Sequence, residues 1–369
     1  MKIAQVLPGS NWGDIGPEVI EKGLGGRETA MIHLSRHWAR LGHEVTNFVP
    51  CERGRRFDED QGVGGRGHHE YIPIGLTNPL LANFPWDACI AWEIPSVFKN
   101  ERIRENVRVK ICEMQVAHFT PGEMEHAEAW CDYIAALSPW HGQFLLHSGL
   151  NFDPERVYVL PNGINVARYH WRGTINPEKP WSFVYSSSPD RGLWNLLKSW
   201  KYIRRDDPQA KLRVCYGNTD YLDTMKWSHG RKGEEALEIS MMINQPGVEF
   251  LGRIGQKDLA FLQEEATAWL YPLDAYWPTE TGCITAIENA AAGNPLIISD
   301  GDCLEDEFGH FSRVIPLPFD AKEWAEATIE TLSDVDSITE MGKAGYEFAA
   351  TRDWSLIAPQ WLELIENHS

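Results

Sequence analysis

The chain has 369 residues, of which 43% are hydrophobic, so it can bury one large core or, as we expect, two cores of ordinary domain size. Its formal charge of −19 argues against broad nucleic-acid binding, which needs Lys and Arg to replace counterions. No apolar run approaches the roughly 20 residues of a membrane span, and the seven cysteines lack a C-x-x-C pair. We expect a cytoplasmic protein with reduced thiols.

The first half of the chain alternates short apolar strands with helices. A strand, a glycine-rich loop and an amphipathic helix open it, and Gly25 and Gly26 directly precede that helix. Backbone amides there can approach a phosphate or a sugar, although a tight turn without a ligand explains a glycine pair equally well. The polar segment 51–69 is predicted to be an exposed loop. Strands near 70–74, 88–92 and 107–112 then predict a mostly parallel sheet.

Two polar residues follow predicted strands in this half. His118 precedes the turn Thr120-Pro121-Gly122, and it is either a loop histidine bonded to the backbone or a group that meets a ligand. Glu93 follows the strand ACIAW and is a weaker candidate of the same kind, since its carboxylate could simply cap the next turn. Ligands of parallel sheets gather at such strand ends.

The second half repeats the alternation. Arg191-Gly192 stands at the turn into a helix, where a guanidinium can pair with two diphosphate oxygens, or else simply face solvent. Farther along this helix, Lys198, Lys201, Arg204 and Arg205 form a basic face. This face is interpreted as solvated, and a peripheral membrane contact remains open. Nothing indicates the oligomeric state.

The most informative stretch is Tyr271–Pro295, YPLDAYWPTETGCITAIENAAAGNP. A strand end and a Pro-bracketed loop lead into a helix predicted from Thr281 to Gly293, and the amides of Gly282 and Cys283 at its start favour an anion. Glu280 and Glu288 are eight positions apart, roughly 12 Å if most of the steps are helical. This spacing suits hydroxyl-binding groups at opposite ends of a nucleotide diphosphate sugar. A capping Glu and a surface Glu on an amphipathic helix are the alternative.

This E-x7-E pattern, followed by A-x-G-x-P, strongly resembles the C-terminal signature of retaining GT-B glycosyltransferases, family 4 in particular (glycosyltransferase group 1). Ser138-Pro139 and Pro161-Asn162-Gly163-Ile164 extend the resemblance through the first half. It implies an α/β GT-B fold, with two Rossmann-like doubly wound domains facing a central cleft. The predicted parts are an acceptor domain at 1–170, a nucleotide-sugar donor domain at 171–345, and a helix at 346–369 that crosses back to the first domain.

The resemblance also implies roles for individual residues. Many family members have a His where this chain has His118, whereas Ser186 stands where they usually have an Arg. Arg253 is our candidate for the missing second charge. The predicted catalytic residues are Glu280, His118 and Arg191, and the predicted donor-binding residues are Gly25, Gly26, Arg191, Arg253, Thr281, Gly282, Cys283 and Glu288.

The predicted activity is that of a hexosyltransferase-type enzyme, which moves a sugar from a UDP- or GDP-linked donor to a carbohydrate or other hydroxyl acceptor with retention. No cofactor is expected. No metal is expected either, because the only D-x-D sequence considered as a metal motif, Asp300-Gly301-Asp302, follows the helix expected to bind the nucleotide and not a fitting strand and turn. Two alternatives remain. One is a nucleotide-sugar epimerase of related fold, and the other is a nucleotide-sugar-binding protein without turnover, suggested by Ser186.

Overall fold

The chain divides into two compact units, each with its own core. The computed structural model describes residues 1–9, 13–59, 67–117, 126–148, 152–171, 173, 175, 177–216, 230–274 and 277–367. The first unit comprises Met1–Ile20, Leu24–Gly163 and Asp353–Ser369, and the second comprises Glu21–Gly23 and Ile164–Arg352. The sequence prediction places the two main boundaries after residues 170 and 345.

The first unit is built on an eight-stranded sheet with the order β3-β4-β2-β1-β5-β6-β7-β8. Neighbouring strands are parallel, except that β3 runs antiparallel to β4. The strands are β1 (Lys2–Val6), β2 (Glu44–Val49), β3 (Arg55–Glu59), β4 (Gly67–Pro73), β5 (Trp86–Trp92), β6 (Val107–Glu113), β7 (Tyr133–Ala136) and β8 (Val157–Val159). Strand β2 lies on one side of β1 and β5 lies on the other, so the winding direction of the sheet reverses between β1 and β5.

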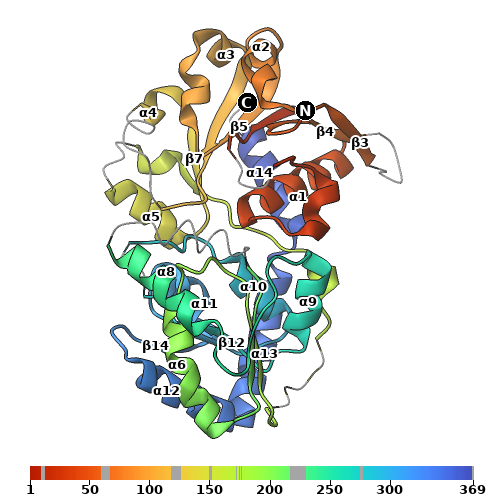
Figure 1. The fold of residues 1–369 in the computed structure, drawn as a ribbon. Coiled ribbons are helices and arrows are strands. Elements are labelled where there is room, and N and C mark those ends of the chain that lie inside the picture. Colours follow the sequence, from red (N-terminus) through yellow and green to blue (C-terminus); the bar gives the residue numbers. More distant parts are fainter. Residues whose placement is uncertain are drawn as a thin grey trace. The chain divides into compact units, whose positions relative to one another are not determined.

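Helices cover both faces of this sheet, as Figure 1 shows. The strand residues alternate between the two faces, so that Ile90 packs with α1 and α14, whereas Cys89 packs with α3, α4 and α5. Helix α14 is joined to α1 by the indole N–H of Trp38, which donates to the Ala358 carbonyl at 2.9 Å. The helices are α1 (Gly26–Arg40), α2 (Thr77–Leu81), α3 (Glu101–Asn106), α4 (Ala127–Trp130), α5 (Pro139–His147) and α14 (Trp354–Asn367).

The prediction of an exposed loop over residues 51–69 was wrong in part. Strand β3 and the start of β4 lie in this segment, and they pair with each other. The reason is aromatic packing: the Phe57 ring stacks on His69, whose side chain is buried and lies 3.3 Å from a carboxylate oxygen of Glu59. The polar composition of the segment hides these contacts.

The second unit has the same doubly wound arrangement. One sheet has the order β11-β10-β9 and another the order β12-β13-β14, and a parallel bridge from Phe183 to Ala268 places β9 beside the start of β12. The combined order therefore reverses direction between β9 and β12. The strands are β9 (Ser182–Tyr185), β10 (Lys211–Val214), β11 (Val248–Phe250), β12 (Trp269–Tyr271), β13 (Leu296–Ser299) and β14 (Arg313–Ile315).

Two groups of helices accompany these strands. Helix α6 contacts α8 and α12, whereas α10 contacts α9 and α13. The helices are α6 (Leu193–Asp206), α8 (Arg231–Met242), α9 (Gln256–Glu264), α10 (Ile284–Ala291), α11 (Leu304–Phe308), α12 (Ala321–Ser333) and α13 (Val335–Ala350). Among the described residues, none of the helices is long and apolar enough to cross a membrane.

Candidate functional site

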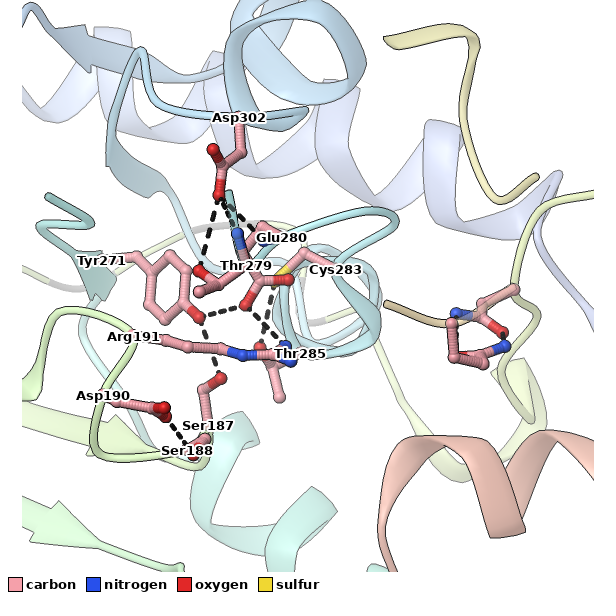
Figure 2. A network of polar contacts seen from close by, with 12 residues as sticks. Ser187, Ser188, Asp190, Arg191, Tyr271, Thr279, Glu280, Cys283, Thr285 and Asp302 are labelled. Atoms are coloured by element: carbon pink, nitrogen blue, oxygen red, sulfur yellow. Dashed lines mark hydrogen bonds and ion pairs between the residues drawn. The ribbon is translucent and has the colours of Figure 1, made fainter. Parts of the chain in front are cut away.

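The carboxyl ends of β9 and β12 meet where the winding of the second unit reverses. In doubly wound sheets this is the position at which ligands bind. Ser187, which follows β9, and Tyr271, which ends β12, join the two strand ends through a hydroxyl–hydroxyl hydrogen bond of 2.8 Å (Figure 2). Both side chains are buried. A polar contact is therefore built into the reversal point of this sheet.

The turn after β9 holds Arg191 at this point. The hydroxyl of the buried Tyr185 lies 2.7 Å from the Ser188 carbonyl oxygen and 3.0 Å from that of Arg191, and its one proton is shared between them, which fixes the path of the turn. Gly192 then adopts a φ of +100°, and a Cβ on it would lie 2.8 Å from the Pro272 carbonyl oxygen. Glycine is needed here for both reasons, so the turn is tied closely to the chain that follows β12.

Glu280 is the centre of the polar network in Figure 2. It is only 2% exposed, and its Oε1 atom accepts a hydrogen bond from Arg191 Nη1 at 3.1 Å and another from the Tyr271 hydroxyl. Burial alone lowers the pKa of Arg191, but Glu280 together with Tyr271, Asp190 and Cys283 outweighs this effect and leaves that pKa well above its usual value. Two predicted site residues that are 89 positions apart are thus joined as an ion pair.

Asp302 holds the backbone at Glu280. Its carboxylate accepts hydrogen bonds from the backbone N–H groups of Thr279 at 2.7 Å and Glu280 at 2.9 Å. Asp302 itself has a φ of +54°, a left-handed conformation that is uncommon outside glycine but that Asp tolerates. Burial raises the pKa of Asp302, although the two backbone hydrogen bonds favour its charged form. Sequence reasoning considered this residue only as part of a metal motif and missed its contact with Glu280.

Helix α10 begins later than predicted. Its first residue is Ile284 rather than Thr281, because Cys283 has the non-helical backbone angles φ −58° and ψ 95°. The estimated separation of Glu280 and Glu288 assumed mostly helical steps, and that assumption was wrong. The N-terminus of α10 has no side-chain cap, and the thiol of Cys283 lies 3.3 Å from the Thr285 hydroxyl. Thr281, Gly282 and Cys283 occupy the segment between Glu280 and the helix.

Glu288 lies on α10 and contacts a separate group of residues. Its Oε2 accepts a 3.5 Å hydrogen bond from the side-chain amide of Gln263, and the Oε1 atom of that amide accepts from the Tyr169 hydroxyl at 3.0 Å. Burial raises the pKa of Glu288 to about 7, while Gln263 and the charge of Arg168 lower it. This carboxyl therefore changes its charge near neutral pH, and it can accept hydrogen bonds from ligand hydroxyls in its ionised form.

Arg253 shares its surroundings with Arg191. Burial raises the pKa of the Tyr216 hydroxyl, and the charges of Arg191 and Arg253 both lower it. The two guanidinium groups therefore act on one hydroxyl in the second unit. The guanidinium of Arg253 also donates to the Gly23 carbonyl at 3.5 Å.

The remaining predicted site residues are not part of the polar network around Glu280. Gly25 and Gly26 lie in the first unit, where Gly25 is the N-cap of α1 and Gly26 is its first residue. His118 lies outside the described residues.

Asp300, the other carboxylate of the Asp-Gly-Asp sequence, accepts a hydrogen bond from the Leu317 amide at 2.9 Å. In the part of the chain that the structure describes, no group of three or more His, Cys, Asp or Glu side chains is arranged to hold a metal ion.

The fold and one domain of the chain match known proteins. Residues 169–348 match the family described as glycosyl transferases group 1. A sucrose-phosphate synthase from Thermosynechococcus elongatus has a TM-score of 0.71 at 17% identity, over 99% of this chain and 98% of that one. Anabaena HepE, solved with UDP and glucose, has a TM-score of 0.69 at 16% identity over 100% of both chains. AviGT4, a glycosyltransferase of avilamycin A biosynthesis, has a TM-score of 0.66 at 18% identity, over 99% of this chain and 97% of that one.

A search of curated protein sequences gave no match. Two Rossmann-like domains and similarity to these structures over nearly the whole chain define the class: the protein has the GT-B fold. The family match then shows that residues 169–348, which lie in the second unit, are a domain of the glycosyl transferases group 1 family.

Proposed function

We propose that this glycosyltransferase is a family 4 enzyme that moves a hexosyl group from a UDP- or GDP-linked sugar to a carbohydrate or other hydroxyl acceptor. The observation that carries the proposal is the ion pair of Arg191 with the buried Glu280, held by Tyr271 at the point where the second sheet reverses. Anabaena HepE, which has the same fold, was also solved with UDP-glucose, and this supports the donor class.

The proposed roles follow from charge and position. Arg191 gives one of its five N–H donors to Glu280, and in the proposal others bind the donor's diphosphate together with Arg253 and the amides of Thr281, Gly282 and Cys283. Glu280 binds hydroxyls of the transferred sugar, and Glu288 binds the ribose hydroxyls. Gly25, Gly26 and His118 remain predicted contributions of the first domain.

The proposed chemistry is a substitution at the anomeric carbon with retention, and it uses no cofactor and no metal. The acceptor oxygen forms a new bond to this carbon, while the bond from the carbon to the diphosphate oxygen breaks. The acceptor proton passes to a phosphate oxygen of the leaving group on the same face. Positive charge grows on the sugar ring and negative charge on the diphosphate, so preorganised groups such as Arg191 would lower the barrier.

Two experiments test the proposal. Thermal shift with UDP-glucose, UDP-N-acetylglucosamine, GDP-mannose and their free nucleotides should show one preferred donor, because a ligand that binds the folded state raises the melting temperature. NMR of the product should then show the anomer of the donor. An inverted product contradicts retention. An epimerised donor formed without acceptor supports the epimerase, and binding without transfer to any acceptor supports a protein without turnover.

A further inference from the structure

The first domain has polar residues at its own reversal point, between β1 and β5. Arg27 is the second residue of α1, the helix that follows β1, and Glu93 follows β5 directly. Their side chains form an ion pair, with Arg27 Nη1 2.5 Å from Glu93 Oε2. Arg27 also donates to the Gly9 carbonyl at 2.6 Å and lies 3.3 Å from Glu28. The reversal point of this sheet thus carries the same kind of pair as Arg191 and Glu280.

Two carboxylate oxygens at this edge lack a donor in the described part of the chain. Glu93 Oε1 and Glu113 Oε2 each expose less than 1 Å² and accept no hydrogen bond there. Glu113 ends β6 and is completely buried, and its other oxygen accepts from Gln115 Nε2 at 2.7 Å. The backbone N–H of Glu93 donates to the Glu113 carbonyl at 2.8 Å, which joins the two strand ends.

Leaving such oxygens without donors is costly. A buried polar atom without a partner destabilises the folded protein, because it has lost its hydrogen bonds to water. Glu93 also has a φ of +61°, a strained conformation for a residue with this side chain, and strain of this kind collects at functional sites. A ligand that donates hydrogen bonds would satisfy both oxygens.

The charges at this edge restrict which ligand can bind. Arg27 faces two carboxylates, those of Glu28 and Glu93, and is therefore already compensated. Burial and the nearby charge of Glu93 hold the pKa of Glu113 well above its usual value, which favours the protonated carboxyl, a form that can donate as well as accept. A phosphate or carboxylate group would meet an acidic environment here, whereas a neutral hydroxyl would find both acceptors and a donor.

We infer that Glu93 and Glu113 form the acceptor site of the first domain, and that it takes a hydroxyl-bearing sugar without phosphate or carboxylate groups. This inference rests on the proposed function and specifies its acceptor. Glu93 accepts a hydrogen bond from an acceptor hydroxyl through Oε1, and Glu113 exchanges hydrogen bonds with the same or a neighbouring hydroxyl. Arg27 is a positioning residue that fixes the carboxylate of Glu93.

The first test uses the full chain and acceptor pairs that differ only in a phosphate: glucose with glucose 6-phosphate, fructose with fructose 6-phosphate, and mannose with mannose 6-phosphate. UDP-glucose and GDP-mannose serve as donors, and nucleotide release and product mass are measured. We expect transfer to at least one uncharged sugar, with a kcat/KM at least ten times that for the corresponding sugar phosphate. Preference for the sugar phosphate overturns the inference.

Failure of the inference can be separated from failure of the proposed function. Calorimetry with both donors, and their slow hydrolysis without acceptor, report on the donor domain alone. If a donor binds and is hydrolysed but no uncharged sugar is accepted, the acceptor site is wrong and the donor site stands. If neither donor binds, the proposed function is contradicted and the inference falls with it.

Variants test the two carboxyl groups directly. Glu93→Gln and Glu113→Gln should each raise the KM for the best uncharged sugar at least tenfold, while the Kd for the donor changes less than twofold. Glu44→Gln is the matched control, because Glu44 lies at the amino end of β2 in the same sheet, whereas Glu93 and Glu113 lie at the carboxyl ends of their strands. A lower melting temperature with an unchanged acceptor KM would show a purely structural role. If Glu113→Gln does not fold, Glu93→Gln decides alone.

Discussion

Glu288→Gln should change how the stability of the second domain depends on pH. Burial raises the pKa of Glu288 from 4.5 to about 7, so the folded protein holds this proton more tightly than the unfolded chain does. The stabilisation is complete below about 4.5 and is lost as the pH rises through 7. The difference is worth about 3 kcal/mol in total, of which about 2.5 kcal/mol falls between pH 5 and pH 8.

Urea unfolding at pH 5 and pH 8, followed by tryptophan fluorescence, measures this effect. Relative to wild type, the glutamine variant should gain about 2.5 kcal/mol of unfolding free energy on going from pH 5 to pH 8. Glu330→Gln is the control, since the Glu330 side chain is 78% exposed in the same domain. Parallel pH dependences for wild type and Glu288→Gln would refute the reasoning that burial controls this carboxyl.

Substitutions at three further positions test individual contacts. Tyr271→Phe removes the hydroxyl that bonds Glu280 and Ser187, so differential scanning calorimetry should show a loss of about 1.5–3 kcal/mol, and an unchanged melting temperature would count against the network. Asp302→Gly suits the left-handed backbone but removes the acceptor for the Thr279 and Glu280 amides, so kcat should fall. Asp302→Asn should keep most of the activity. Equal kinetics in both variants would show that Asp302 does not position the backbone at Glu280. Trp38→Phe should destabilise the first domain by about 1 kcal/mol in urea, because Ala358 loses its indole donor.

Much of the fold could be predicted from the sequence, because strand and helix periodicities are local. The alternation of apolar strands and helices predicted a mostly parallel sheet, and the resemblance of the E-x7-E stretch to GT-B glycosyltransferases implied two doubly wound domains. The segment 51–69 misled the prediction, since its aromatic and histidine contacts join β3 to β4 and leave little hydrophobic pattern. The predicted start of α10 was wrong because the backbone of Cys283 is not helical.

The candidate site was predictable only residue by residue. Arg191 and Glu280 each stood out at a turn, but their ion pair depends on β9 and β12 being neighbours, which no local pattern encodes. The contact of Asp302 with Glu280 crosses 22 positions in the same way. Glu113 gave no signal, because a single acidic residue at a strand end is ordinary in sequence and becomes unusual only when it is fully buried.

The most direct test of the central claim is calorimetric titration of the preferred free nucleotide diphosphate, UDP or GDP, into wild type, Arg191→Ala and Arg205→Ala. Arg205 lies in the last turn of α6, the helix that begins just after Arg191, and its guanidinium rests over the Tyr202 ring. The account predicts that Arg191→Ala binds the nucleotide at least ten times more weakly, because the diphosphate loses a guanidinium, while Arg205→Ala binds it as wild type does. Equal affinity in all three proteins would contradict the account.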